Sequence, residues 1–386
     1  MKIALLTTDD RHAFRQYDKP EPFFGTAPEA LLQGFAALPG VEVHVVSCTR
    51  QPVRSPTKKA DNIWFHSVLV PKFGWMSSLY QGCIRAVRKK LREIRPNIVH
   101  GQGTELDCGI SAAFSGFPNV ITIHGNMRAI AEIYGARVGS FHWLAAQLET
   151  LALRRTAGVF CNSDYTETLV GPRSRKTWRV ANALRLPFFA PPAAFTSGPD
   201  RLVILHIGVL EPRKQQVELL QAARHWHECG LKFELQFIGR RSTDTDYGRR
   251  FARELAIAEA TGYARHIGTL PTGPLIATLD AAHALIHFPT EEAFGLVVAE
   301  ALARNLKFFG SNVGGVPDIA QDVESAELFA PDDWVGLGNA IGRWIAADCP
   351  RPSTAAATMR ERYHPLVIAR RHLEIYQEVL SLKPEH

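Results

Sequence analysis

The stretch that decides the fold is HFPTEEAFGLVVAEALA, residues 287–303. It joins an apolar run, ALIHF at residues 284–288, to an amphipathic segment that we expect to become helical near Phe294 or Gly295. A strand that passes through a turn into a helix leaves backbone N–H groups without partners at the helix start, where the helix dipole adds partial positive charge. Glycine lets such a backbone approach a ligand closely. The pattern therefore predicts an anion site at the backbone of residues 293–296.

Apolar runs of this kind, rich in Val and Ile, alternate with helical patterns along the whole chain, as is typical of parallel α/β units. The predicted strands are KIALLTT (2–8), VEVHVVS (41–47), NIVHGQG (97–103), NVITIHG (119–125) and GVFCNS (158–163) in the first half, and LVILHIG (202–208), FELQFIG (233–239), ALIHFP (284–289) and LKFFGS (306–311) in the second. Between the two sets, residues 183–200 are rich in Pro and Ala and lack an amphipathic period.

This organisation predicts two Rossmann-like domains, which the length of 386 residues accommodates. We place the first at residues 1–182, the linker at 183–200 and the second at 201–363. A final amphipathic helix at 364–386 completes the chain, with the option that it packs back onto the first domain.

Charge is divided unevenly between the halves. Residues 1–190 contain 24 Lys and Arg against 14 Asp and Glu, a net charge of +10, and the remainder has 20 against 24, a net charge of −4. A helix predicted at residues 80–95 has one apolar stripe, flanked by basic residues at 85, 88, 89, 90, 92 and 95. This basic face is either simply solvated or rests on an anionic membrane, where it would bring the protein to a lipid-linked or phosphorylated substrate. No nucleic-acid motif accompanies it, so nucleic acid is the less favoured partner.

The six cysteines are scattered and include no C-x-x-C pair, so the sequence predicts neither a zinc site nor a disulfide framework, and a reducing cytoplasm fits best. The start MKIALLTT leads directly into a strand rather than a signal peptide. No run approaches the roughly 18 apolar residues that a membrane-spanning helix needs. We expect a cytoplasmic protein, at most peripheral on the inner face of a membrane.

Further glycine turns follow other strands. Gly208 ends a strand and precedes the basic pair Arg213 and Lys214, which suits a diphosphate if the pair is more than surface charge. SNVGGVPDI (311–319) follows the strand at 306–311. In open α/β sheets, ligands bind at the carboxyl ends of the strands. In the first half, Gly25 and His124 stand at comparable places, unless they are only turn residues.

Two glutamates in the deciding stretch are candidates for binding hydroxyl groups. Glu292 precedes the turn, and Glu300 lies eight residues on, inside the helix. Carboxylates accept hydrogen bonds from sugar hydroxyls. Alternatively, Glu292 only stabilises the helix dipole and Glu300 is a solvated surface residue.

Taken together, these motifs resemble the GT-B glycosyltransferases, and in particular the retaining, family 4-like enzymes with two glutamates separated by seven residues. The resemblance rests on EAFGLVVAE (292–300), TIHG (122–125), CNSDYTETL with Ser163, VANAL with Asn182, the RK pair and GGVPDI. It covers nearly the whole chain. It implies two Rossmann-like domains facing across a cleft, with the first binding the acceptor and the second the donor.

Carried over by residue, the resemblance implies that Glu292 and the backbone of Phe294, Gly295 and Leu296 hold the transferred sugar and its phosphate. Glu300 would bind the donor ribose. Lys214 and Arg213 would neutralise the diphosphate near Gly208, and Gly25 and His124 would approach the donor from the first domain. Val209 stands where the family commonly has an arginine.

The resemblance implies a metal-independent, retaining transfer of a hexose from a UDP- or GDP-linked sugar to an acceptor hydroxyl, in bacterial-type polysaccharide or glycolipid assembly. Apart from this donor substrate no cofactor is expected, and the oligomeric state is left open. Two alternatives remain at this point: a noncatalytic sugar-nucleotide-binding protein, which Val209 suggests, and a sugar-nucleotide epimerase.

Three other motifs are set aside. Asp244-Thr245-Asp246 spells the D-x-D motif of metal-dependent glycosyltransferases, but it lies in a polar loop where a solvated turn is favoured. His225 and His227 are two residues apart and face different sides of a helix, so we do not expect them to bind one metal ion together. The G-x-G at 101–103 lacks the third glycine of a dinucleotide fingerprint, because Leu106 stands in its place.

Overall fold

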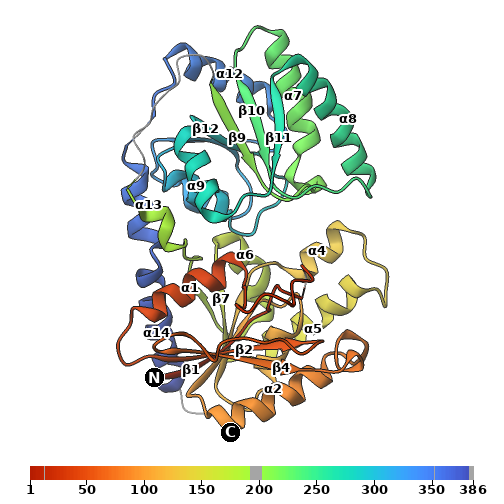
Figure 1. Cartoon of the computed structure of the whole chain (residues 1–386), viewed down its shortest axis with the longest axis vertical. Helices are drawn as coiled ribbons and strands as arrows, with labels where there is room; N and C mark the ends of the chain where they lie inside the picture. The colour runs from red at the N-terminus through yellow and green to blue at the C-terminus, as the bar shows by residue number, and fades with distance from the viewer. Residues whose placement is uncertain (13, 192–201, 352, 382–386) are drawn as a thin grey trace. The chain divides into compact units, whose positions relative to one another are not determined.

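The computed structural model describes residues 1–12, 14–191, 202–351 and 353–381. The chain divides into two compact units, unit 1 with Met1–Arg185 and Tyr363–His386, and unit 2 with Leu186–Arg362. Each is built on a sheet of mostly parallel strands covered by helices (Figure 1). Half of the predicted linker, residues 192–200, lies outside the described residues. The acceptor and donor roles predicted for the two halves stay predictions.

Unit 1 has an eight-stranded sheet of order β3-β4-β2-β1-β5-β6-β7-β8, in which only the pair β3–β4 is antiparallel. Its strands are β1 Lys2–Leu6, β2 Glu42–Thr49, β3 Lys58–Ala60, β4 Ile63–Leu69, β5 Ile98–Gln102, β6 Asn119–Ile123, β7 Gly158–Cys161 and β8 Thr177–Arg179. The five predicted runs are β1, β2, β5, β6 and β7. Strands β3, β4 and β8 lie outside the predicted runs because they are short or carry polar residues.

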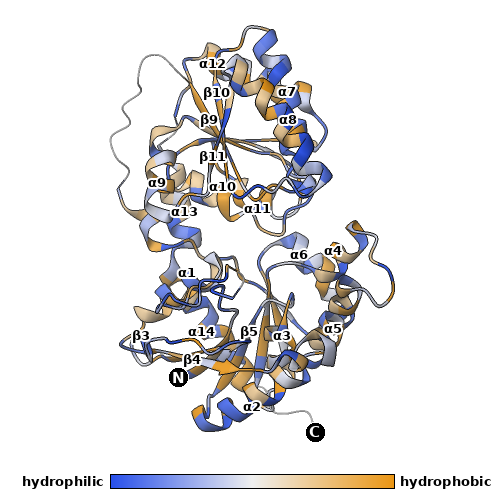
Figure 2. Cartoon of the chain, turned by 45° about the vertical axis from the view of Figure 1, so that its right-hand side comes forward, coloured by the Kyte–Doolittle hydropathy of each residue, from blue (hydrophilic) through white to orange (hydrophobic). Residues whose placement is uncertain are grey.

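Helices cover both faces of this sheet. They are α1 Thr26–Ala36, α2 Gln81–Ile94, α3 Asp107–Ala113, α4 Met127–Ile133, α5 Phe141–Arg155, α6 Asp164–Val170 and α14 Pro365–Ser381, with short 3-10 turns η1 Lys72–Gly74, η2 Met76–Ser78 and η3 Gly171–Arg173. Helix α13 Ala355–Tyr363 belongs to unit 2 except for its last residue. One apolar cluster joins α1 and α14 to alternate residues of the strands, and a second joins α2, α3 and α5 to the intervening ones. This alternation is the period-2 pattern of strands buried on both sides. Figure 2 shows the apolar strands inside and the polar outer faces of the helices.

Helix α2 shows how the sequence sets an element. Its predicted apolar stripe, Tyr80, Ile84, Val87, Leu91 and Ile94, is buried, which confirms the prediction. The helix itself is one residue shorter at each end, because Tyr80 and Arg95 adopt left-handed backbone conformations.

Helix α14, in the sequence of the predicted C-terminal helix, packs on α1 within unit 1. At this contact a Cβ on Gly34 would lie 2.1 Å from the carbonyl oxygen of Pro365, so only glycine allows the helices to approach so closely.

Unit 2 has a six-stranded, all-parallel sheet of order β11-β10-β9-β12-β13-β14. Its strands are β9 Val203–Ile207, β10 Glu234–Ile238, β11 Ala264–Gly268, β12 Ala284–His287, β13 Lys307–Ser311 and β14 Ala326–Phe329. Its helices are α7 Gln216–Glu228, α8 Asp246–Thr261, α9 Thr272–Ala281, α10 Leu296–Leu302, α11 Val316–Ala320 and α12 Trp334–Ala346, with 3-10 turns η4 Leu186–Phe189 and η5 Pro212–Lys214. The two edge strands, β11 and β14, lie outside the predicted runs. Helices α7, α8 and α12 share one apolar cluster with the strands.

The deciding stretch forms strand β12, a turn and helix α10. The helix begins at Leu296, later than the predicted start at Phe294 or Gly295, because Gly295 has a left-handed backbone with φ of 99° and caps the helix instead. Fold and sheet type therefore agree with the expectation, and the helix start is corrected by one to two residues.

Candidate functional site

The carboxyl ends of β9, β12 and β13 meet at one edge of the unit 2 sheet, where glycine turns bring backbone segments together. The turn after β13 packs directly on Glu292. A Cβ on Gly314 would lie 1.8 Å from the carbonyl oxygen of Glu292, and the N–H of Gly315 donates to that same oxygen at 2.9 Å. The GGVPDI segment thus holds the backbone of Glu292 in place.

At this edge the side chain of Glu292 is bound by two others. Lys214, at the end of η5, forms an ion pair with Oε2 of Glu292. His287, the last residue of β12, has Nε2 at 2.8 Å from the same Oε2. All three side chains are largely buried. Since a carboxylate only accepts hydrogen bonds, Nε2 of His287 carries the proton and donates it.

The electrostatics keep this cluster charged at Glu292 and neutral at His287. Burial by itself would raise the pKa of Glu292, but the hydrogen bond from His287 and the charge of Lys214 outweigh it and hold that pKa well below its usual range. Burial lowers the pKa of His287, against the opposing effect of Glu292. Glu292 is therefore an ionised acceptor at neutral pH.

This arrangement leaves one oxygen of Glu292 available. Both donors reach Oε2, and within the described parts of the chain no residue donates to Oε1. A carboxylate fixed through one oxygen can accept a hydroxyl hydrogen bond at the other. The cluster is thus suited to orienting a polyhydroxylated ligand beside the cation of Lys214.

The second predicted cation is engaged elsewhere. Nε of Arg213 is 2.8 Å from Glu211 Oε2, and its Nη1 is 3.6 Å from Glu291 Oε2. These two carboxylates offset part of the charge that Arg213 could offer to a phosphate. Val209, at the position where the resemblance predicts an arginine, is 44% exposed and brings no charge to the edge. Lys214 is therefore the cation that the site presents beside Glu292.

The structure revises two other predictions, the exposure of Glu300 and the anion site at residues 293–296. Glu300 is 7% exposed within α10, which rules out the alternative that it is a solvated surface residue. Helix α10 has only seven residues, so its dipole and its first N–H groups offer a weaker anion site at residues 293–296 than a long helix would. Phe294 and Gly295 are buried, and Leu296 is half-buried.

Gly208 borders a small hollow at the ends of β9, β10 and β11. It has about 10 Å³ of free volume, roughly room for one water molecule. His206 and His266 line it together with Arg240 and Arg241. Burial lowers the pKa of His206 to about 3, so this histidine is neutral and cannot serve as a phosphate cation.

In unit 1, His124 follows β6 and is half-buried. Its Nε2 lies 2.9 Å from Oε1 of Gln102, whose own amide reaches His100. Burial lowers the pKa of His124 to about 4, so it is neutral at physiological pH. The next residue, Gly125, donates its N–H to Glu105 Oε1 at 2.7 Å. The loop after β6 is thus held by hydrogen bonds rather than by charge pairs.

Gly25 directly precedes α1, at the end of a loop that begins after β1. It has an ordinary φ of −55°, and an added Cβ would meet only Pro28 at 3.8 Å. Neither its backbone nor its surroundings require glycine, so its predicted approach to the donor has no steric support within unit 1.

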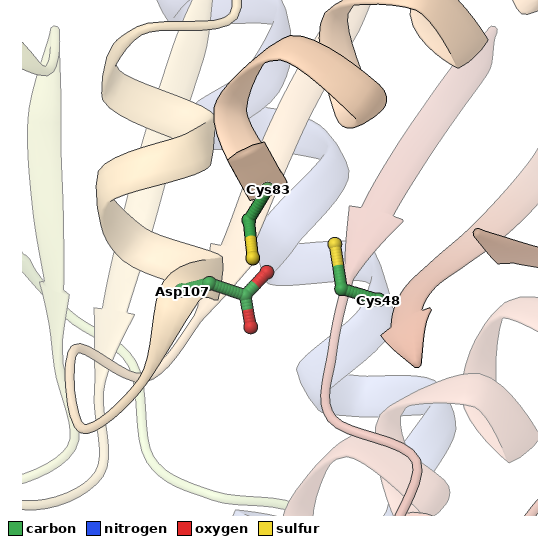
Figure 3. A group of neighbouring side chains, drawn as sticks. All are labelled: Cys48, Cys83 and Asp107. Carbon is green, nitrogen blue, oxygen red and sulfur yellow. The ribbon is translucent and has the colours of Figure 1, made fainter. Parts of the chain in front are cut away.

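Sequence reasoning missed several of the residues that the fold brings together. His287 could have been suspected as a histidine that ends a buried strand five residues before Glu292. Gln102 gives no such signal, because its contact with His124 exists only through strand pairing. The same holds for a buried group of Cys48, Cys83 and Asp107 at the unit 1 sheet edge (Figure 3).

The motifs that were set aside have structural roles. Thr245 caps α8 by accepting the N–H of Gly248, and Asp244 and Asp246 are exposed at that helix start, which agrees with a solvated turn. His225 and His227 have separate neighbours, with Cys229 near the first and Tyr263 stacked on the second.

Comparison with known proteins now identifies the family. Residues 192–361 match the family of glycosyl transferases group 1, and residues 29–175 match glycosyltransferase family 4. The chain belongs to the group 1, family 4-like glycosyltransferases. Sequence relatives of this glycosyltransferase include a 2-deoxystreptamine glucosyltransferase from Streptomyces kanamyceticus, 24% identical over 86% of this chain and 87% of that protein. A glycogen synthase from Mycobacterium tuberculosis is 29% identical over 75% of this chain and 70% of that protein.

Solved structures place the glycosyltransferase in the GT-B fold. Sucrose-phosphate synthase from Thermosynechococcus elongatus superimposes with a TM-score of 0.77 at 17% identity, covering 99% of each chain. The Anabaena protein HepE in complex with UDP-glucose superimposes with a TM-score of 0.71 at 16% identity, covering 98% of this chain and 100% of that one. These likenesses confirm the expected fold class.

Proposed function

We propose that this glycosyltransferase moves a hexose from a nucleoside diphosphate sugar to an acceptor hydroxyl, with retention of the anomeric configuration and without a catalytic metal. The observation that carries the proposal is the cluster of Lys214, Glu292 and His287 at the unit 2 sheet edge. It offers one cation and one oriented carboxylate oxygen side by side. A sugar diphosphate needs both.

In the proposed reaction the bond between the sugar carbon and the diphosphate oxygen breaks, and a bond to the acceptor oxygen forms on the same face. The acceptor's proton leaves with the departing diphosphate. Negative charge grows on that leaving group, and a fixed cation in a buried site stabilises it effectively. Lys214 supplies this charge, with Arg213 as a second cation. Glu292 orients the sugar, and Glu300 binds the ribose.

We infer a UDP- or GDP-linked donor. Support for UDP comes from the Anabaena relative of similar fold, whose structures hold UDP and UDP-glucose. We place the acceptor beside His124 in unit 1, where a neutral imidazole and backbone groups suit an uncharged hydroxyl better than a phosphate. A carbohydrate or lipid-linked acceptor in polysaccharide or glycolipid assembly fits this chemistry.

Thermal-shift measurements with nucleoside diphosphates and their sugars test the donor. A ligand at 100 times its Kd adds about 2.7 kcal/mol of stability, which a melting curve resolves. Slow release of free sugar from one donor would identify an enzyme, and NMR of the transferred sugar's anomeric configuration then tests retention. Binding without turnover with any acceptor favours the noncatalytic alternative, for which Val209 is the motivating residue. An altered sugar nucleotide without acceptor would reveal an epimerase.

A stimulation test addresses the metal. Added Mg²⁺ or Mn²⁺ should leave turnover nearly unchanged, because the proposed cations are side chains. A strict requirement for either ion would contradict the proposed chemistry and return attention to Asp244 and Asp246.

We also propose that the enzyme is cytoplasmic and docks on an anionic membrane through α2. Five basic residues of α2 and its end are exposed: Arg85, Arg88, Lys89, Arg92 and Arg95. Apolar side chains precede this basic face. Phe73, in η1, is 83% exposed, and η1 packs on the start of α2, where Gly74 and Gly82 touch. A cationic face beside an exposed aromatic is suited to a headgroup surface. No helix in the described ranges is long and apolar enough to span a membrane.

Cosedimentation with vesicles tests this docking. Binding should rise with anionic lipid and fall with salt, and the triple variant Arg88→Glu, Lys89→Glu, Arg92→Glu should lose it. Phe73→Ser should weaken binding at high salt as well. The matched control reverses three exposed arginines of α8, Arg249, Arg250 and Arg253, with the same change in net charge. Equal binding to neutral and anionic vesicles would contradict the proposal and favour a soluble acceptor.

A further inference from the structure

Two cysteines and an aspartate come together in unit 1, far apart in sequence and outside the donor chemistry of unit 2. Cys48 lies at the end of β2, Cys83 in the first turn of α2, and Asp107 is the first residue of α3. One ligand atom from each lies within 4.8 Å of the others. Figure 3 shows both sulfur atoms and the carboxylate turned toward a common centre.

The cluster is buried, which makes its polarity costly. The exposed fractions are 8% for Cys48, 0% for Cys83 and 5% for Asp107. In the described parts of the chain no Lys or Arg forms an ion pair with Asp107. A buried carboxylate without a counter-charge is unfavourable. A bound cation would supply the missing positive charge.

The spacing of the three ligand atoms is close to that of a metal site. Ligand atoms around one tetrahedral ion lie about 3.5 to 3.8 Å apart, given bond lengths near 2.0 to 2.3 Å. The observed spacing needs only a small contraction to reach that geometry.

We infer that Cys48, Cys83 and Asp107 form a binding site for a borderline-soft divalent cation, for which Zn²⁺ is the best match. Two sulfur ligands with one oxygen ligand favour Zn²⁺ over Mg²⁺ or Ca²⁺, which require oxygen donors. Cys108 does not join the set, because its sulfur faces Thr8 Oγ1 at 3.8 Å. The fourth position is open to a water molecule. The ion would tie β2 to α2 and α3 and so brace the unit 1 sheet edge.

Co²⁺ is the spectroscopic probe for this site. The work is done in a Cys229→Ser background without an affinity tag, since exposed Cys229 lies 3.7 Å from His225 and is a competing thiol. We expect one Co²⁺ per chain, with thiolate charge-transfer bands and the visible bands of a tetrahedral ion, displaced by Zn²⁺. Cys48→Ser, Cys83→Ser and Asp107→Asn should each weaken Co²⁺ binding by about 100-fold or more, because even loss of an outer hydrogen bond costs 10–100-fold.

The matched control is Cys161→Ser, which removes another fully buried thiol of the same sheet and should keep the bands. If a variant does not fold, cysteine alkylation is measured instead on the folded Cys229→Ser protein. Zn²⁺ should slow alkylation of Cys48 and Cys83 at least tenfold relative to chelator-treated protein and leave Cys161 unchanged. The inference would be overturned if Co²⁺ gave no charge-transfer bands, or if the bands survived in the Cys48→Ser, Cys83→Ser double variant. It would also be overturned if Zn²⁺-loaded and chelator-treated protein were alkylated at equal rates, or if Cys48 and Cys83 formed a disulfide in protein kept under reducing conditions.

Discussion

The carboxyl edges of the unit 1 and unit 2 sheets carry different chemical groups. In unit 2, the edge is ionic: Lys214 and Glu292 are paired in a largely buried site, and His287 fixes the carboxylate. In unit 1, the loop after β6 is held by a hydrogen bond between the neutral His124 and Gln102 and by one from the N–H of Gly125 to the carboxylate of Glu105. The comparison teaches that a cation paired with a carboxylate marks the edge where a diphosphate is proposed to bind, whereas the loop proposed to meet the acceptor hydroxyl presents a neutral imidazole.

The net charges of the two halves, taken alone, would suggest that the phosphate-binding cation lies in the first half. In the half with +10, exposed positive residues cluster on α2. The half with −4 contains the buried Lys214. Overall charge therefore reports on the surface, while the placement of one buried ion pair reports on the site.

The largest effect should come from Lys214→Ala. It removes the proposed phosphate cation and leaves Glu292 with only His287, so turnover should fall roughly 100-fold or more, at about 1.5–3 kcal/mol for each charged hydrogen bond lost. Steady-state kinetics with the true donor measure this. Lys232→Ala, at an exposed lysine of the same unit, should be nearly neutral. Near-normal turnover in Lys214→Ala would show that the ionic edge is not the donor site.

Substitution of the two glutamates should change different kinetic constants. Glu292→Ala should lower kcat about tenfold or more with a smaller change in KM, and Glu300→Ala should mainly raise the donor KM, because a ribose contact is made equally in the ground and transition states. Glu324→Ala, at an exposed site, is the control. Wild-type kinetics in both variants would make the two-glutamate assignment wrong.

Acid should destabilise the neutral interior of unit 1. Burial lowers the pKa of His372 to about 4, so the unfolded chain takes up a proton near pH 6.5 that the folded chain refuses, and stability falls as pH falls. Between pH 7.5 and 5 this single histidine accounts for about 2 kcal/mol. His372→Gln should flatten the pH dependence of urea unfolding by that amount. Ile375→Val, without a titrating group, should shift the curve and keep its slope, and an unchanged slope in His372→Gln would refute the assignment.

The smallest effect should come from Val209→Arg. It adds an exposed cation next to Gly208 and should raise donor affinity two- to fivefold, at roughly 0.2–1 kcal/mol for an exposed pair. Isothermal titration with the nucleoside diphosphate measures it, with Val335→Arg at another exposed valine of unit 2 as control. Equal gains in both variants would mean that only net charge matters.

The sequence by itself determined the parallel α/β architecture, nine of the strands, the apolar face of α2 and the stretch from His287 to Ala303. These follow from local patterns: runs of Val and Ile, glycine turns and helical spacing are written in neighbouring residues. It also named Lys214 and Glu292, because both stand beside glycine turns at strand ends.

Only the tertiary structure decided how these residues meet. The pairing of Lys214 with Glu292 and the contact of Gly314 with the Glu292 backbone join segments far apart in the chain. So does the convergence of Cys48, Cys83 and Asp107. Such contacts depend on which strands are neighbours and where each one ends. Local patterns do not encode that order, because every parallel strand resembles the next and the connections between them set the arrangement.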